Sequence, residues 1–199
     1  MNQSEHILEL ARQLHVLRAV DVREHGWSPQ LLIRLHQEGR LQRLGRGLYG
    51  LPNVEVTEHQ TLMEVCQRVP KAVVCLLSAL QFHEIGTQSP HEVWVALPPG
   101  THTLELGYPP LRVARMGGAA YSEGILAVTA HGAPIRVYSA AKTVTDCFKF
   151  RNKIGLDVAL ESLKDAWRRR KVTVAELMHF ARINRVERVM QPYLEAVTH

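Results

Sequence analysis

The chain has 199 residues, 46% of them hydrophobic and 22% charged, which is an ordinary globular composition and excludes a disordered protein. Its formal net charge of +5 is compatible with a polyanionic partner but does not require one. Cys66, Cys75 and Cys147 lack the spacing of a metal site, so we expect buried thiols in a reducing compartment. With no membrane-spanning apolar run and no signal sequence, we expect a cytoplasmic protein.

Three helices are predicted in the first forty residues. Apolar residues between Ile7 and Leu17 recur at helical spacing, which predicts an amphipathic helix there, and residues 19–25 form a short second helix. We interpret Trp27, in the turn that follows, as a core residue rather than a base-stacking group.

The third helix begins at Ser28 and Pro29, because serine is a preferred N-cap and proline suits the first helical position. Leucines share one face of this helix, and the opposite face carries the polar side chains of Gln30, Arg34 and Gln37. Such a helix can enter the major groove of DNA.

Gly39 is placed to end this helix, and residues 41–51 are typical of a hairpin with Arg46 at the tip of a glycine turn. A helix followed by such a hairpin is the outline of a winged helix-turn-helix. Three-helix units with a wing also serve as protein-docking modules, but we favour DNA because only Glu38 opposes the cations. The predicted DNA-binding residues are Ser28, Gln30, Arg34, Gln37, Arg40, Arg43 and Arg46.

A domain boundary is predicted after this hairpin, which gives a DNA-binding domain over residues 1–53 and a second domain over residues 57–199. Thr57 and Gln60 match a capping box, so a helix is expected to begin there and to end before Pro70.

The middle of the chain is predicted to form a small, mainly antiparallel sheet. Residues 72–77 are continuously apolar and fit either a buried strand or a buried helix. Alternating or β-branched patterns predict further strands at residues 92–97, 111–116, 125–130 and 135–138.

The remainder is predicted to be helical. Ser139 caps a helix, residues 156–168 form an amphipathic helix, another begins at Val174, and Pro192 interrupts the last. The expected fold class is therefore α+β: an N-terminal winged helix-turn-helix followed by an α+β domain with C-terminal helices.

No catalytic motif stands out. The sequence has no phosphate-binding glycine loop, no nucleophile elbow and no paired cysteine or histidine metal spacing. Asp146, Glu161 and Lys164 combine carboxylates with a lysine, as metal-dependent nucleases do, but they fall on predicted helices and we interpret them as solvated helix faces. We therefore expect that the protein is not an enzyme and that it binds no cofactor and no metal ion.

A second basic region lies between residues 148 and 172, with eight lysines and arginines against three acidic residues. It fits either a contact surface for an acidic protein or a nucleic acid, or a solvated helix end that compensates the helix dipole. The sequence leaves these two interpretations open.

Five segments resemble the AbiEi antitoxins, the regulatory half of type IV abortive-infection toxin–antitoxin systems. The N-terminal segment, residues 18–52, is similar to the winged helix-turn-helix of that family. The C-terminal segments are KAVVCLLSALQFHEIGTQSPHEVWVAL, PPLRVARM, IRVYSAAKTVTDCFKFRNKIGLDVALESLKDAWRRRK and RVMQPYLEA, of which YSAAKTVTDCFKFRNKIGLDVALE is the most specific.

The resemblance implies a repressor that binds inverted repeats in operator DNA upstream of its own two-gene operon. It also implies a C-terminal domain that neutralises a nucleotidyltransferase-like toxin, without the two proteins needing to form a stable complex. The DNA-contacting role carries over onto the helix and hairpin residues named above. For the antitoxin or partner surface we suggest Lys142, Lys149, Arg151, Lys153 and Arg168. The alternative is a stand-alone regulator or docking module without antitoxin activity.

Overall fold

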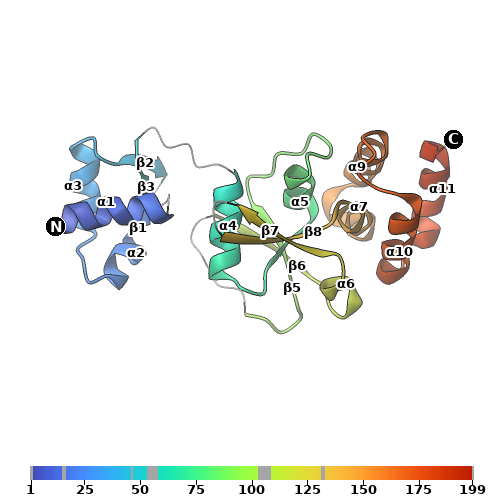
Figure 1. Ribbon diagram of the computed structural model, residues 1–199, viewed down its shortest axis with the longest axis horizontal. Helices are drawn as coiled ribbons and strands as arrows, with labels where there is room; N and C mark the ends of the chain where they lie inside the picture. Colours follow the sequence, from blue (N-terminus) through green and yellow to red (C-terminus); the bar gives the residue numbers. More distant parts are fainter. Residues whose placement is uncertain are drawn as a thin grey trace. The chain divides into compact units, whose positions relative to one another are not determined.

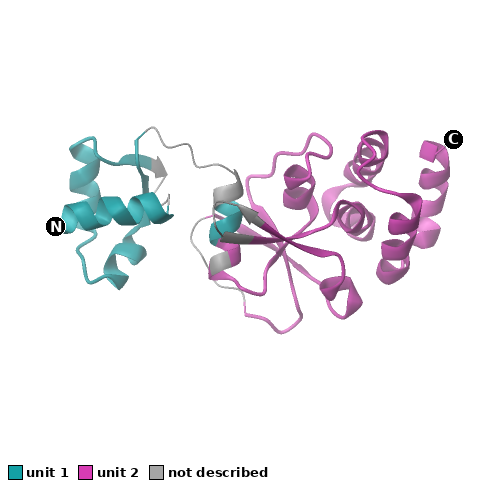
Figure 2. Cartoon of the chain, viewed as in Figure 1, with its two compact units in different colours: residues 1–64 teal, residues 65–199 magenta. Residues whose placement is uncertain are grey.

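A computed structural model describes residues 2–14, 17–45, 47–52, 58–102, 109–130 and 133–198 (Figure 1). The chain divides into two compact units, residues 1–64 and residues 65–199, which Figure 2 draws in different colours. Each unit has its own sheet and buried core, and the mixture of helices and strands is an α+β architecture, as predicted. No helix in these described ranges is long and apolar enough to cross a membrane.

The N-terminal unit contains three short helices and a small sheet, followed by the start of a fourth helix. In chain order its elements are α1 (Gln3–Leu14), β1 (Leu17–Arg18), α2 (Ala19–Glu24), α3 (Gln30–Gln37), β2 (Gln42–Gly45), β3 (Leu48–Gly50) and α4 (Glu58–Arg68). The strands pair antiparallel in the order β1-β3-β2. The division between the units falls after Glu64, within α4.

The first helix differs from its prediction at both ends. It begins at Gln3 and ends at Leu14, and Leu17 belongs to a strand that pairs with Tyr49 of β3. Leu17 is fully buried, as its place in the apolar spacing indicates. The apolar spacing correctly predicted that Leu17 is a core residue but assigned it to a helix instead of a strand. Pairing with a distant strand is a tertiary contact, which local spacing does not report.

The core of this unit is formed by apolar residues from its first three helices, from the first strand and from the turn after α3. Trp27 is half-buried and packs against this core, as predicted, and its ring stacks with those of His6 and His25. The buried residues are Ile7, Leu8, Leu10, Ala11, Leu17, Val22, Leu32, Leu35 and Leu41.

The second unit consists of a five-stranded sheet and a set of C-terminal helices. Its elements are β4 (Val73–Val74), α5 (Leu76–Phe82), β5 (Val93–Leu97), β6 (Leu111–Arg115), α6 (Ala119–Ser122), β7 (Ile125–Ala130), β8 (Ala133–Tyr138), α7 (Ala140–Lys149), α8 (Arg151–Ile154), α9 (Leu156–Arg168), α10 (Val174–Asn184) and α11 (Glu187–Thr198).

The sheet of this unit is mixed, which corrects the prediction of a mainly antiparallel sheet. Its strand order is β6-β5-β4-β8-β7, and the pairs β5·β6 and β4·β8 are parallel. The antiparallel pairs are β4·β5 and β7·β8. The strand positions follow from the sequence pattern, but strand direction does not, because the alternation of side chains is the same in both kinds of sheet.

The apolar stretch from Ala72 to Leu77 turns out to be both a strand and a helix start. Val73 and Val74 form β4, and α5 begins at Leu76, whose φ is 46°. Cys75 lies between them and is fully buried, and the other two cysteines are buried free thiols as well. Burial raises the pKa of each thiol.

Helix α7 is central to the helical part of this unit. It contacts α5, α9 and α10 (Figure 1). Every residue from Ala141 to Phe148 is buried. Ser139 caps it as predicted, accepting a hydrogen bond from the backbone of Lys142. Helix α11 continues through Pro192, contrary to the predicted interruption, so the loss of one helical hydrogen bond is tolerated there.

Candidate nucleic-acid interface

Helix α3 has one buried and one exposed face. Leu32 and Leu35 are 1% and 0% exposed and pack into the core of the N-terminal unit. Gln30, Arg34 and Gln37 are all exposed, which is the arrangement that the helical spacing predicts. The amide and guanidinium groups of this face are therefore accessible to a partner.

The start of α3 is close to the predicted one. The helix begins at Gln30, and Pro29 already has helical dihedral angles, with φ −60° and ψ −18°. The Ser28 hydroxyl accepts a hydrogen bond from the backbone N–H of Gln30 at 3.3 Å. Ser28 thus satisfies one of the free N–H groups at the helix start, although it lies one residue before the N-cap, Pro29.

The end of α3 is a glycine cap. Gly39 has a φ of +70°, a conformation that residues with a Cβ rarely adopt. Its N–H bonds to the carbonyl of His36, and the N–H of Arg40 bonds to the carbonyl of Leu35. This pair of bonds is a Schellman motif, which turns the chain sharply and leaves Arg40 exposed at the start of the hairpin.

Arg34 is engaged with a neighbour on its own helix. Its Nε donates to Glu38 Oε1 at 2.8 Å, and the two side chains are 69% and 37% exposed. Exposed pairs at this spacing contribute only about 0.3–0.5 kcal/mol. The pair can therefore open when a stronger anion approaches Arg34.

The hairpin after α3 pairs Gln42 with Gly50 and Arg43 with Tyr49, and its register shifts between Arg43 and Gly45. Arg43 is exposed. Arg46, the predicted tip residue, lies outside the described residues.

Ile33, which is 51% exposed on α3, was not among the residues predicted to form the interface. An isoleucine on the otherwise polar side of the helix is the signal that could have identified it.

Lys142 is a correction to the predicted partner surface. Its side chain is 0% exposed, and its Nζ lies 2.5 and 2.6 Å from the two carboxylate oxygens of Asp146. It also lies 4.3 Å from the centroid of the Tyr138 ring. A buried cation needs such a partner, so Lys142 belongs to the core and cannot be part of a surface.

The same buried pair overturns the interpretation of Asp146 as part of a solvated helix face. Asn184 of α10 also donates to Asp146, at 2.7 Å, so α10 covers this side of α7. Glu161 lies on α9, where it accepts from Thr87. In the described part of the chain, no group of histidine, cysteine, aspartate and glutamate side chains is arranged to hold a metal ion.

The other residues suggested for the antitoxin surface are partly or fully exposed, and most make local contacts. Lys149 donates to Asn184 at 3.4 Å, and Arg151 donates to the carbonyl of Phe148 at 2.8 Å. Lys153 lies over the Phe150 ring. They do not form one cluster with Arg168, which sits at the far end of α9.

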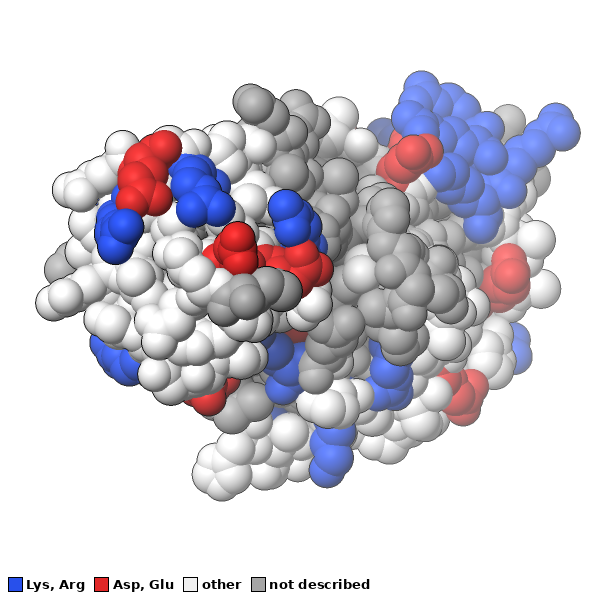
Figure 3. Space-filling view, turned by 60° about the vertical axis from the view of Figure 1, so that its left-hand side comes forward, with Lys and Arg blue, Asp and Glu red and all other residues white. Residues whose placement is uncertain are grey.

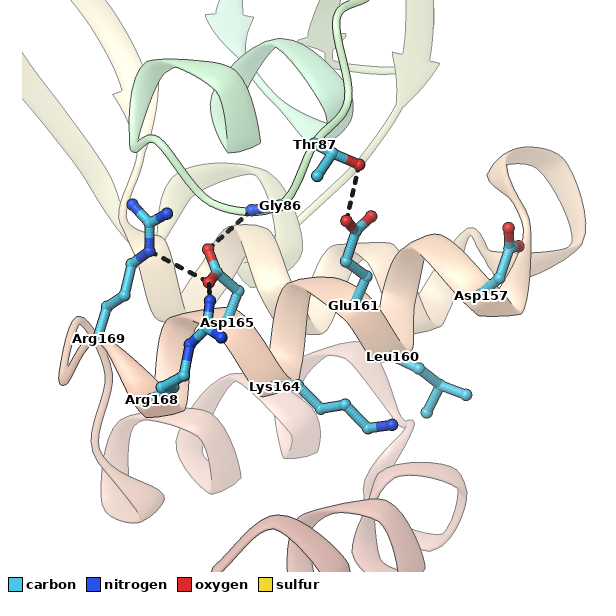
Figure 4. A pocket seen from close by; sticks show the side chains of 9 residues that line it. All are labelled: Gly86, Thr87, Asp157, Leu160, Glu161, Lys164, Asp165, Arg168 and Arg169. Carbon is cyan, nitrogen blue, oxygen red and sulfur yellow. Dashed lines mark hydrogen bonds and ion pairs between the residues drawn. The ribbon is translucent and has the colours of Figure 1, made fainter.

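The basic run at the end of α9 acts largely as an internal clamp. Arg168 and Arg169 both donate to Asp165, at 2.7 and 3.1 Å, and Figure 4 shows them converging on its carboxylate. From the other side the N–H of Gly86 donates to Asp165 at 3.0 Å. Lys171 donates to the carbonyl of His83. The run therefore ties α9 to the loop after α5.

Asp165 is the centre of this clamp. Burial acts to raise its pKa, but the Gly86 hydrogen bond and the two guanidinium groups outweigh it and hold the pKa of Asp165 below its usual range. Beside it lies a cavity of about 550 Å³ between α9 and the loop. Acidic and basic residues line this cavity in equal number, so it has no clear preference for an anion or a cation.

Comparisons with known proteins bear on both units. Residues 5–52 match the family described as "Transcriptional regulator, AbiEi antitoxin". No protein of curated function is matched by the chain. The fold is similar to the crystal structure of the Rv2827c protein from Mycobacterium tuberculosis, with a TM-score of 0.63 and 15% identity, over 98% of this chain and 77% of that one. At this identity the similarity concerns the fold alone.

Proposed function

From the match of residues 5–52 to the AbiEi transcriptional regulators and antitoxins, we propose that this chain is a DNA-binding repressor of its own operon. We propose further that its C-terminal unit counteracts a nucleotidyltransferase-like toxin. The observation that carries the first part is the exposed polar face of α3, on a helix whose opposite face is buried.

The order of elements in the N-terminal unit supports this proposal. Helices α2 and α3 are joined by a short turn, and a hairpin follows α3, as in a winged helix-turn-helix. In that arrangement α3 is the recognition helix and the hairpin is the wing. Ser28 and Gln30, at the start of α3, are then placed to contact phosphates through the helix N-terminus.

Base recognition falls to the middle of α3. Arg34 can bind the major-groove edge of guanine once it leaves Glu38, and Gln37 can bind that of adenine. Arg40, Arg43 and Arg46 then contact phosphates or the minor groove. Two copies on inverted repeats would follow the symmetry of the operator.

The test compares a duplex that contains the DNA upstream of the gene with a random duplex of equal length. We expect Gln37→Ala to narrow the affinity gap between the two by about 1–3 kcal/mol, because a bidentate base contact is lost. Val20→Ala, a change at an exposed residue outside α3, is the control. Equal effects of the two variants would contradict the role assigned to α3.

The antitoxin part of the proposal rests on the resemblance of the C-terminal segments. The candidate surface is reduced to Lys149, Arg151 and Lys153, with Arg168 as a separate candidate at the other end of α9 and Lys142 excluded because it is buried. The test is growth rescue when the nucleotidyltransferase-like protein is produced with wild-type protein or with a charge-neutral variant at these positions. If the wild-type protein represses its promoter but never rescues growth, the antitoxin role is refuted and the protein is a stand-alone regulator.

A further inference from the structure

The N-terminal unit carries little net charge for a DNA-binding role. Residues 1–64 hold seven arginines, no lysine and eight acidic residues, for a formal net charge of −1. In the view of Figure 3, which brings this unit forward, the basic side chains at the front lie singly with acidic side chains beside them. Because attraction to phosphates grows with the number of cations, this unit depends more on contacts with base edges.

Ile33 is an apolar exception on the exposed face of α3. It is 51% exposed, more than any other large hydrophobic residue that the structure describes. Gln30 and Gln37, about one helical turn to either side, are exposed as well, and so is Arg34 beside it. Positions i, i+3, i+4 and i+7 share one face of a helix, so these four side chains form a single stripe.

The fold gains little from an isoleucine at this position. Leu32 and Leu35 fill the core side of α3, and within the described chain Ile33 is not among the residues packed against that core. An exposed β-branched residue is also a poorer helix former than alanine or leucine. Apolar protein-docking surfaces are contiguous, whereas the neighbours of Ile33 in its stripe are polar.

The major groove of DNA offers a matching partner, the C5 methyl group of thymine. The adenine that we assign to Gln37 is paired with a thymine, so a thymine methyl lies in the groove that α3 would enter. An α-helix rises about 1.5 Å per residue, so Ile33 and Gln37 are about 6 Å apart along the axis. This distance is less than two base-pair steps of about 3.4 Å each.

The side chain of Ile33 is well suited to such a contact because it is rigid. A β-branched side chain in a helix has one strongly preferred χ1 rotamer. The backbone of α3 is held as well, by the Ser28 hydrogen bond at its start and the Gly39 cap at its end. Ile33 therefore loses little conformational freedom on binding, whereas Arg34 must first leave Glu38.

We propose that Ile33 contacts the C5 methyl group of a thymine within two base pairs of the adenine bound by Gln37, and that it is a specificity-determining residue of the operator site. This inference rests on the DNA binding proposed above. It adds an apolar base contact to the polar contacts proposed for Arg34 and Gln37. The operator must then contain a thymine at that position.

The test uses the duplex with the DNA upstream of the gene in two forms, with thymine or with uracil, which lacks only the methyl group. For the wild type we expect uracil to weaken binding about fourfold for each contacted methyl, the effect of burying one methyl-sized group. In Ile33→Ala this preference for thymine should shrink by about fourfold. Random duplexes in both forms report any effect of the methyl groups on DNA shape.

Replacing the thymines one at a time then locates the contacted base. One thymine should weaken binding of the wild type when it is replaced by uracil and leave binding of Ile33→Ala unchanged. Thermal melting of Ile33→Ala should show no loss of stability, because alanine is the better helix former. Ile33→Gln, with another good helix former, provides a second variant should the alanine variant fail to fold.

The matched control is Val20→Ala, which shortens another β-branched residue of the same unit, 42% exposed on α2. It should keep the thymine preference of the wild type. A wild type that binds both forms equally, or an Ile33→Ala variant with an unchanged preference, overturns the inference. Weaker growth rescue by Ile33→Ala with an unchanged preference would also overturn it and assign Ile33 to a protein partner. A wild type that binds the upstream duplex no better than the random one refutes the proposed function itself.

Discussion

Helices α3 and α7 both have an apolar face and a polar face with a cation, yet only α3 keeps its polar face in solvent. On α3, Arg34 and Gln37 are exposed, and the basic side chain pairs loosely with Glu38. On α7, Lys142 and Asp146 are both 0% exposed. The difference teaches that a polar helix face indicates a surface only if no further layer covers it, and α10 covers α7.

The largest expected effect comes from breaking the buried pair of α7. Asp146→Ala leaves Lys142 without its carboxylate in the core, and we expect a loss of about 3–5 kcal/mol in the free energy of unfolding. Urea denaturation checks this value. The double variant Lys142→Met/Asp146→Leu should recover most of the stability, because it removes both charges from the core. If Asp146→Ala were as stable as the wild type, α10 would not cover this part of α7.

A smaller effect is expected where α3 ends. A Cβ added at Gly39 would have no atom within 4 Å, so only the positive φ disfavours alanine there. We expect Gly39→Ala to lower the free energy of unfolding by about 1 kcal/mol. Thermal melting measures it. Repression should weaken in parallel, because the same turn places Arg40 and the hairpin. Unchanged stability would show that the helix end can adopt another conformation.

The clamp at Asp165 predicts a pH dependence. Because the folded-state pKa of Asp165 is lowered, its contribution to stability is present above the ordinary carboxylate pKa and is lost as the pH falls through the lowered value. Wild type and Asp165→Asn should therefore differ in urea midpoint at neutral pH and converge in acid. A difference that stays constant with pH would contradict the lowered pKa.

The smallest effect on stability is expected on the exposed face of α3. Glu38→Gln removes a surface pair, so the free energy of unfolding should fall by only about 0.3–0.5 kcal/mol. The same change frees Arg34 and removes a negative charge, so affinity for duplex DNA should rise. Fluorescence anisotropy measures this affinity, and weaker binding would mean that Glu38 positions Arg34 for the DNA.

Much of the N-terminal unit could be predicted from the sequence. The leucine spacing of α3 and Gly39 each report a local rule that the structure follows, whereas the helix starts one residue later than Ser28 and Pro29 predict, with Pro29 as its N-cap. The first helix was predicted less well, because Leu17 is buried by strand pairing rather than by helix packing. The described strands of the second unit were located from their apolar patterns, but not their directions.

The sequence by itself determined where most helices and strands lie and which face of α3 is apolar, because hydrophobic periodicity and capping act over a few residues. Only the tertiary structure decided that Lys142 lies in the core, that the sheet is mixed and that most of the basic run after α9 is bound internally. Each of these depends on segments far apart in the chain, and a local pattern carries no information about what packs against it.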